Sequence, residues 1–300
     1  MKSQYMIDPI QNGEEAYVLS IQSHVAFGYV GNRAAVMPLN ALGLETIAVH
    51  TVQLSNHTGY GAFKGEFFTA QHIQNVLDGV EERGLFPKIR AVLTGYLGDP
   101  TLGDIVLDTV QKIRDASGAS VLYTCDPVMG DVGRGFFVKD ALPPFFKDKA
   151  IARADIITPN QFELEYLTDH PINSIEDAYK VCDKMHELGV EIVLLTSLEH
   201  KDTPDDQIEM MASTAKGRFL VTTPKIHFDP APNGSGDCTA ALFCGHILKG
   251  CSVEQALCLT AGGIYGVFEK TKALGRRELA LVQSQGDFDN PAHKFPIIKI

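Results

Sequence analysis

The most constraining feature of the chain is a repeated alternation of short apolar runs with longer segments of helical periodicity. Strand-like runs occur at residues 16–22, 46–52, 89–94, 121–125, 155–157 and 192–195, with helical spacing at 32–42, 71–82 and 102–116 and from about 160 and 174 onward. Such units connect through right-handed crossovers and build a mostly parallel sheet covered by helices on both faces. The sequence therefore predicts a three-layer α/β/α fold.

The pattern changes after residue 207. Two strand-like runs at 208–212 and 219–222 predict an antiparallel hairpin that closes one edge of the sheet, and two apolar helices are expected at 238–248 and 253–268. The chain shows no internal repeat and no linker rich in Pro, Gly or Ser. We expect one domain, residues 1–300, with residues 1–15 as a flexible polar extension.

Composition argues against several classes of function. The formal net charge of -11 opposes binding to nucleic acid, whose phosphates attract clustered Lys and Arg side chains. No apolar run approaches the roughly 20 residues that span a bilayer, and the polar N-terminus does not resemble a secretion signal. The six cysteines contain no Cys-x-x-Cys pair and are expected to be reduced thiols. These features predict a cytoplasmic protein with no nucleic-acid or membrane partner.

The most informative short segment is Gly234-Ser-Gly-Asp237, which leads directly into an apolar helical run. Glycines let backbone amides converge on an anion, and the helix dipole adds positive potential at the same point. Asp237 stands in the first turn, where a carboxylate can accept a proton. An ordinary glycine turn with an N-cap is the alternative. Since the chain has no Gly-x-x-x-x-Gly-Lys-Ser/Thr motif, the segment indicates phosphoryl transfer without a P-loop.

Two polar clusters follow predicted strands. Asp126 and Asp131 come after the run at 121–125, and their carboxylates suit Mg²⁺, although a polar Asp-Pro turn would also explain them. Thr158, Asn160 and Glu163 come after the run at 155–157, where helix capping is the alternative explanation. Because the carboxyl ends of parallel strands meet at one edge of a sheet, we expect both clusters to lie beside Asp237.

Two further loops are polar, aromatic and punctuated by glycine. They span residues 23–32 and 52–61, and each also follows a predicted strand. Hydroxyl groups for hydrogen bonds and aromatic rings for stacking would suit a flat polar heterocycle. The loops are therefore expected to bind the acceptor of the phosphoryl group.

Several of these segments resemble the pyridoxal kinase family of the ribokinase-like superfamily. The resemblance runs from about residue 17 to the last helices and is carried by Ser20-Ile-Gln-Ser-His-Val25, Gly28-Tyr-Val-Gly-Asn-Arg-Ala-Ala35, Ser55-Asn-His-Thr-Gly-Tyr60, Val92-Leu-Thr-Gly-Tyr96, Cys125-Asp-Pro-Val-Met-Gly-Asp131 and Asp155-Ile-Ile-Thr-Pro-Asn-Gln-Phe-Glu163. It implies a ribokinase-like fold and a cytosolic, homodimeric kinase that phosphorylates the 5′-hydroxymethyl group of pyridoxal, pyridoxine or pyridoxamine.

The resemblance also implies roles for individual residues. Asp237 matches the catalytic base and contacts the substrate, and the residues that match the ring-binding positions are Ser23, Thr58 and Tyr96. The positions that match ATP contacts are Asp126, Thr158, Asn160, Thr196, Ser197, Gly234, Ser235 and Gly236. Those that match metal-organising positions are Asp131, Thr158 and Glu163.

The implied cofactors are ATP, Mg²⁺ with Zn²⁺ as an alternative, and a monovalent cation, K⁺ or Na⁺. The chain departs from the family at Phe137, where a tyrosine that reaches the phosphate is expected, and in having Gly-Ser-Gly-Asp where Gly-Thr-Gly-Asp or Gly-Val-Gly-Asp is usual. Two alternatives remain: a hydroxymethylpyrimidine kinase of the same fold, and a pyridoxal-binding protein without catalytic activity.

Overall fold

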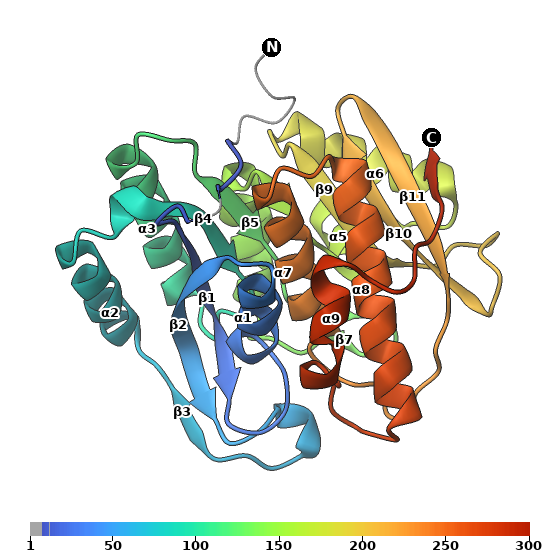
Figure 1. The fold of residues 1–300 in the computed structure, drawn as a ribbon, viewed down its shortest axis with the longest axis horizontal. Helices are drawn as coiled ribbons and strands as arrows, with labels where there is room; N and C mark the ends of the chain where they lie inside the picture. The colour runs from blue at the N-terminus through green and yellow to red at the C-terminus, as the bar shows by residue number, and fades with distance from the viewer. Residues whose placement is uncertain (1–7, 12) are drawn as a thin grey trace.

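A central ten-stranded sheet organises the protein. The computed structural model describes residues 8–11 and 13–300 (Figure 1). The strand order is β12-β11-β10-β9-β8-β5-β4-β1-β2-β3. The parallel strands are β1 (Tyr17–Val25), β2 (Glu45–Leu54), β4 (Ile89–Thr94), β5 (Leu122–Cys125), β8 (Ile156–Ile157) and β9 (Ile192–Leu198). The predicted mostly parallel sheet is confirmed.

Antiparallel strands flank this parallel centre on both sides. β10 (Gln207–Thr214) and β11 (Gly217–Pro224) form the predicted hairpin, and β10 pairs with β9. The hairpin does not end the sheet, because β12 (Ile297–Lys299) pairs outside β11. At the opposite edge β3 (Gly65–Phe67) pairs with β2. Each of these two outer strands has three residues, too few for an alternating pattern to be recognised in the sequence.

Helices cover both faces of the sheet. In Figure 1, α1, α7 and α8 lie in front of it. This face carries α1 (Asn32–Ala41), α7 (Ser235–Leu248), α8 (Val253–Ala273) and α9 (Gln285–Asp289). The other carries α2 (Ala70–Glu82), α3 (Thr101–Ala116), α4 (Leu142–Phe145), α5 (Gln161–Thr168) and α6 (Ile175–Glu187). Short helical turns span Thr58–Tyr60, Phe86–Lys88, Phe146–Ala150, Ile151–Arg153 and Val282–Ser284.

Successive side chains of a strand face opposite sides of the sheet, so each strand contributes to both apolar layers. In β9, Val193 and Leu195 pack on the side of α5 and α6, whereas Ile192 and Leu194 pack on the side of α7 and α8. All four side chains are buried, and burial of each such side chain stabilises the fold by about 1.5–3 kcal/mol. Together with the helices on both faces, this confirms the three-layer α/β/α architecture.

Helix α7 is enclosed by the rest of the protein over most of its length. It packs against α1 and α8, and every residue from Cys238 to Leu248 is buried. A helix that is apolar on all sides is expected to be enclosed by protein. Its N-terminus is consequently held in a fixed place at the carboxyl edge of the sheet.

The N-terminal segment is described only in part. Residues 1–7 and 12 of the expected extension lie outside the described residues. The Ile10 amide donates a hydrogen bond to the carbonyl of Leu248 at 2.9 Å, and the Arg90 guanidinium donates one to the carbonyl of Asp8 at 2.6 Å. Across residues 8–11 and 13–300, none of the helices combines the length and apolar character needed to cross a bilayer.

Candidate active site

The predicted site residues lie at the carboxyl edge of the parallel strands. Ser23 stands near the end of β1, Tyr96 follows β4, Asp126 follows β5, Thr158 follows β8, and Thr196 is near the end of β9. These strands are neighbours in the sheet and point the same way. The topology therefore places segments from across the sequence along one edge, where ligands bind in open α/β sheets.

Asp237 stands in the first turn of α7. The residue before the helix, Gly234, has φ 88°, which is the left-handed conformation that glycine adopts without strain. Ser235 and Asp237 are half-buried and Gly236 is exposed. The first amides of the helix have no partner within it, so they and the helix dipole favour a negative charge at this point. The arrangement suits a phosphoryl group.

Three carboxylates share this region. Burial raises the pKa of Asp126 well above its usual range, and the negative charges of Glu163 and Asp237 raise it further. Burial raises the pKa of Asp237 to about 6, although a hydrogen bond from the Gly31 amide partly opposes the shift. Burial also raises the pKa of Glu163 to about 7, against the effect of hydrogen bonds from backbone amides. In each case burial therefore disfavours the ionised form of the carboxyl group.

The carboxylate of Asp126 accepts a hydrogen bond from the Thr158 hydroxyl at 3.0 Å. Asp126 forms no ion pair with any residue in the described part of the chain. The same residues contain no group of three or more His, Cys, Asp or Glu side chains able to hold a metal ion. A single buried carboxylate that lacks a cation suits Mg²⁺, which completes its shell with water and substrate phosphates. The donor set at Asp126 thus fits a magnesium ion that arrives with a nucleotide.

Glu163 and Asn160 form a capping box at the start of α5. The Asn160 side chain accepts from the Glu163 amide, and the Glu163 carboxylate accepts from the Asn160 amide, both at 2.9 Å. The other oxygen of Glu163 accepts from the Met129 amide at 2.9 Å, and the Asn160 side chain donates to the carbonyl of Gly130 at 2.8 Å. Both oxygens of Glu163 are therefore engaged by backbone amides. The pair joins the loop after β5 to α5.

Asp131 lies in a small hairpin formed by β6 (Gly130–Asp131) and β7 (Gly135–Phe136). Its carboxylate accepts from the Val132 amide at 2.8 Å and raises the pKa of Glu163 through its charge. The Phe137 ring that follows the hairpin is 47% exposed, and the Arg134 guanidinium lies 5.3 Å from its centroid. The hairpin therefore presents an aromatic ring and a cation where a tyrosine hydroxyl was expected.

The expected nucleotide contacts at the end of β9 adjoin the start of α5. The Thr196 amide donates to the carbonyl of Pro159 at 2.9 Å, so Thr196 lies beside Asn160. Ser197 is exposed and has φ 52°, a left-handed conformation that is uncommon for a residue other than glycine. Ser197 lies in an irregularity of β9, where the pairing with β10 shifts between Leu195 and Leu198, and no pattern in the sequence indicates it.

The loop of residues 28–31 joins the acceptor side to Asp237. A Cβ atom at Gly31 would overlap the backbone and hydroxyl of Ser23, and one at Gly234 would overlap the carbonyl oxygen of Tyr29. The loop therefore packs directly on Ser23 and on the start of α7. Thr58 is exposed in its 3₁₀ turn, and Tyr96 packs against four apolar residues, Val25, Val30, Val52 and Leu54.

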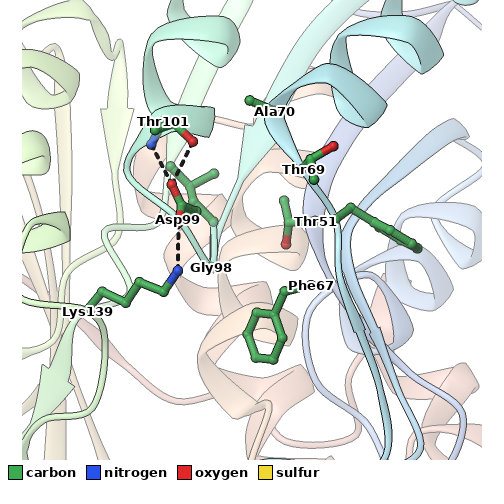
Figure 2. A pocket seen from close by; sticks show the side chains of 10 residues that line it. Thr51, Phe67, Thr69, Ala70, Gly98, Asp99, Thr101 and Lys139 are labelled. Carbon is green, nitrogen blue, oxygen red and sulfur yellow. Dashed lines mark hydrogen bonds and ion pairs between the residues drawn. The ribbon is translucent and has the colours of Figure 1, made fainter.

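A cavity of about 370 Å³ lies between the start of α2 and the start of α3 (Figure 2). It is lined by Thr51, Phe67, Phe68, Thr69, Ala70, Leu97, Gly98, Asp99, Thr101 and Lys139. Asp99 accepts from the Thr101 amide at 3.0 Å and from the Thr101 hydroxyl and Lys139 ammonium at 2.6 Å each. These hydrogen bonds lower the pKa of Asp99 to about 2, and the bond from Lys139 has the largest effect. The ion pair links the segment after the β6–β7 hairpin to the start of α3.

Sequence reasoning missed several contacts at the site. The Gly31 amide that faces Asp237 and the Asp99–Lys139 pair were not predicted. Neither was Glu278, which bonds to residues of both acceptor-side loops. These contacts join residues far apart in the chain and follow no short motif, so no signal in the sequence could have identified them.

Comparison with known proteins finds relatives that match most of the chain. A family model described as phosphomethylpyrimidine kinase matches residues 35–280. Pyridoxal kinase PdxY of Rubrobacter xylanophilus is 47% identical over 284 residues, which cover 94% of this chain and 97% of that protein. Pyridoxal kinase PdxY of Corynebacterium diphtheriae is 46% identical, over 94% of this chain and 99% of that protein.

Solved structures give the same match. Pyridoxal kinase from Leishmania donovani in complex with ADP and pyridoxamine has a TM-score of 0.87 at 27% identity, over 95% of this chain and 99% of that one. Pyridoxal kinase from Entamoeba histolytica has a TM-score of 0.86 at 29% identity, with the same coverage.

Proposed function

The chain belongs to the phosphomethylpyrimidine kinase family and, within it, to the pyridoxal kinases, and from this premise we propose the reaction and its chemistry. The enzyme transfers the γ-phosphoryl group of ATP to the 5′-hydroxymethyl group of pyridoxal, and also of pyridoxine and pyridoxamine. The observation that carries the proposal is the position of Asp237, in the first turn of α7 and within electrostatic reach of Asp126.

Asp237 acts as the general base in this proposal. With a pKa of about 6 the carboxylate is mostly ionised at neutral pH, yet it is basic enough to accept a proton as the hydroxyl attacks. The fixed N-terminus of α7 keeps the base close to the anion site, so the attacking oxygen and the phosphoryl group meet in one place.

The amides from Gly234 to Asp237 bind the phosphoryl group as it transfers. Phosphoryl transfer depends mainly on positioning and on stabilisation of charge on the moving group. The open start of α7 supplies amide donors and the positive end of the helix dipole. Gly234 allows the close approach of the 28–31 loop beneath this anion hole.

Mg²⁺ bound with the nucleotide would be held through Asp126, with Asp131 and Thr158 nearby, and would neutralise charge on the phosphates. Glu163 acts indirectly in this proposal, because both of its oxygens already accept from amides. It keeps the loop after β5 fixed against α5. Asn160, Thr196 and Ser197 complete the nucleotide side, which is consistent with the ADP in the Leishmania relative.

Ser23, Thr58 and Tyr96 bind the pyridine ring on the acceptor side. Ser23 and Thr58 offer hydroxyl groups for its polar atoms, and the half-buried ring of Tyr96 offers an aromatic surface. The pyridoxamine in the Leishmania relative supports an acceptor of this kind.

The test is a comparison of initial rates of ADP formation with pyridoxal and with hydroxymethylpyrimidine as acceptors. The matching family model is described for the phosphorylated pyrimidine, which makes that ring the second candidate. Faster turnover of pyridoxal supports the proposal, and faster turnover of hydroxymethylpyrimidine overturns it. Binding of pyridoxal without ADP formation would indicate a binding protein that lacks catalytic activity.

A further inference from the structure

Glu278 connects the two loops on the acceptor side of the site. Its carboxylate accepts a hydrogen bond from the Tyr60 hydroxyl at 2.5 Å and another from the Tyr29 amide at 3.0 Å. Tyr60 ends the 3₁₀ turn that contains Thr58, and Tyr29 belongs to the loop that leads into α1. This half-buried carboxylate therefore bonds to two segments, one that follows β1 and one that follows β2.

Arg277 strengthens the hold on the first of these segments. Its guanidinium lies 3.8 Å from the centroid of the Tyr60 ring and donates a hydrogen bond to the carbonyl of Gly59 at 3.2 Å. A cation over an aromatic face is attracted to the negative face of the ring. Arg277 and Glu278 together thus contact the ring and hydroxyl group of Tyr60 and the backbone of Gly59.

The segment that carries Glu278 is itself firmly anchored. The next residues, from Leu279 to Leu281, are fully buried in the core beneath α8. The Ala280 amide donates to the Thr271 hydroxyl at 2.9 Å, and the Arg276 amide donates to the Thr271 carbonyl at 3.2 Å. The carboxylate therefore extends from a rigid base and not from a loose loop.

The contact with the 28–31 loop is close. Gly28 has φ 90°, and a Cβ atom at this position would overlap the Glu278 carboxylate. Beyond it, the Tyr29 carbonyl contacts Gly234, the residue that precedes the first turn of α7, in which Asp237 stands. A group that fixes Tyr29 consequently fixes the loop that touches the base.

We propose that Glu278 is a positioning residue, which holds the Thr58 turn and the 28–31 loop in register with Asp237 and thereby sets affinity for the acceptor. The inference rests on the proposed function, because it takes the Thr58 turn as part of the vitamin B6 site. Glu278 acts through Tyr60 and Tyr29 and not by contact with the reacting atoms.

The test compares three variants with the unaltered protein. Tyr60→Phe removes one hydrogen bond and keeps the ring under Arg277, Glu278→Ala removes both bonds, and Glu278→Gln keeps an acceptor for one of them. Glu269→Gln is the matched control, because Glu269 lies on α8 and bonds only to His293, at 2.9 Å, among the described residues. The measurements are kcat, KM for pyridoxal, KM for ATP, and amide hydrogen exchange of residues 28–32 and 57–61.

Tyr60→Phe is expected to raise KM for pyridoxal about tenfold, the worth of one hydrogen bond to a charged group, with kcat and KM for ATP nearly unchanged. Glu278→Ala is expected to raise the same KM and also to lower kcat about tenfold, because the loop beside Asp237 is freed as well. Glu278→Gln should lie between the two. In Glu278→Ala both loops should exchange faster, and Glu269→Gln should change nothing.

Two results would overturn the inference: unchanged exchange of both loops in Glu278→Ala, or an unchanged KM for pyridoxal in that variant. A uniform fall in activity with equal effects on both substrates would also contradict it, since that is the mark of general destabilisation. If the unaltered protein fails to phosphorylate pyridoxal, the proposed function fails, while the exchange measurement still decides whether Glu278 positions the loops.

Discussion

The carbonyl oxygen of Tyr29 occupies the space in which a Cβ atom of residue 234 would lie. Gly234 also has φ 88°, so a side chain there would meet both an overlap and a strained backbone. The loop before α1 and the start of α7 therefore touch only because residue 234 is glycine. This contact joins the proposed acceptor side of the site to the turn that carries the proposed base, Asp237.

Gly234→Ala is expected to lower the free energy of unfolding by about 2–4 kcal/mol, because overlap and left-handed strain act together. Kinase activity should fall with it as the anion hole is displaced. The measurements are urea denaturation and initial rate of ADP formation. Gly236→Ala is the matched control, since no atom lies within 4 Å of a Cβ atom there. Its free energy of unfolding should change by less than about 1 kcal/mol, and equal losses in both variants would disprove the packing argument.

Asp237→Asn is expected to lower kcat by about 10²- to 10⁴-fold, the usual worth of a general base. The same change should stabilise the protein. Burial raises the pKa of this carboxyl from 3.8 to about 6, so its ionised form is disfavoured in the folded state. Removing the charge should raise the free energy of unfolding by about 1–3 kcal/mol above pH 6 and by nothing below pH 3.8.

Thermal and urea denaturation at pH 4, 5, 6 and 8 would show this stabilisation growing up to about pH 6 and levelling off above it. Asp289→Asn, which alters an exposed carboxylate paired with Lys249, serves as the control and should show no such gain. Full turnover by Asp237→Asn would show that another group accepts the proton.

The pH dependence of kcat/KM should have an acid limb near pH 6. Because the base must be ionised to accept a proton, activity falls as pH drops through the raised pKa of Asp237. The rate at pH 5 should be about a tenth of the plateau, as expected for one group with this pKa. If the midpoint of this limb is the same for pyridoxal and pyridoxine, the ionising group belongs to the enzyme and not to the substrate. A midpoint near pH 4 would contradict the raised pKa of Asp237.

Glu163→Ala should lower the free energy of unfolding by more than the loss of an ordinary capping box does. Three amides donate to this carboxylate, and the change would leave them without their partner, at about 1–3 kcal/mol for each buried donor that water cannot reach. KM for ATP should rise as the loop after β5 is released. Gln255→Ala is the matched control, because Gln255 closes the exposed capping box of α8 with Ser252. Gln255→Ala should lower the free energy of unfolding by about 1 kcal/mol. An equal loss in Glu163→Ala would show that the bonds from the Met129 and Gly130 amides do not stabilise the protein.

Much of the fold could be predicted because its strands and helices are long and periodic. Helix α3 is recognisable from apolar residues at helical spacing, and its observed bounds differ from the predicted 102–116 by one residue. The strands β3 and β12 were missed, since three residues cannot show alternation. Their place in the sheet depends on partners elsewhere in the chain.

The site was predictable where its residues follow strands. The positions of Asp126 and Thr158 after β5 and β8 were enough to expect them at one edge, and they are hydrogen-bonded to each other. The sequence allowed Thr158 or Asn160 as the N-cap of a helix, but not that Glu163 closes a capping box with Asn160 and also binds the loop after β5. The bond between Glu278 and Tyr29 could not be predicted, because their residue numbers differ by 249 and Glu278 belongs to no motif.

That separation also bears on how the protein is made. Synthesis at about 5–20 residues per second would put an interval on the order of 10–50 s between Tyr29 and Glu278, whose numbers differ by 249. Throughout this time the nascent acceptor loops lack the carboxylate that ties them together. On the ribosome, substrate affinity would therefore be acquired late, after most of the sheet has been synthesised, and a chain cut short before Arg277 would leave those loops untethered.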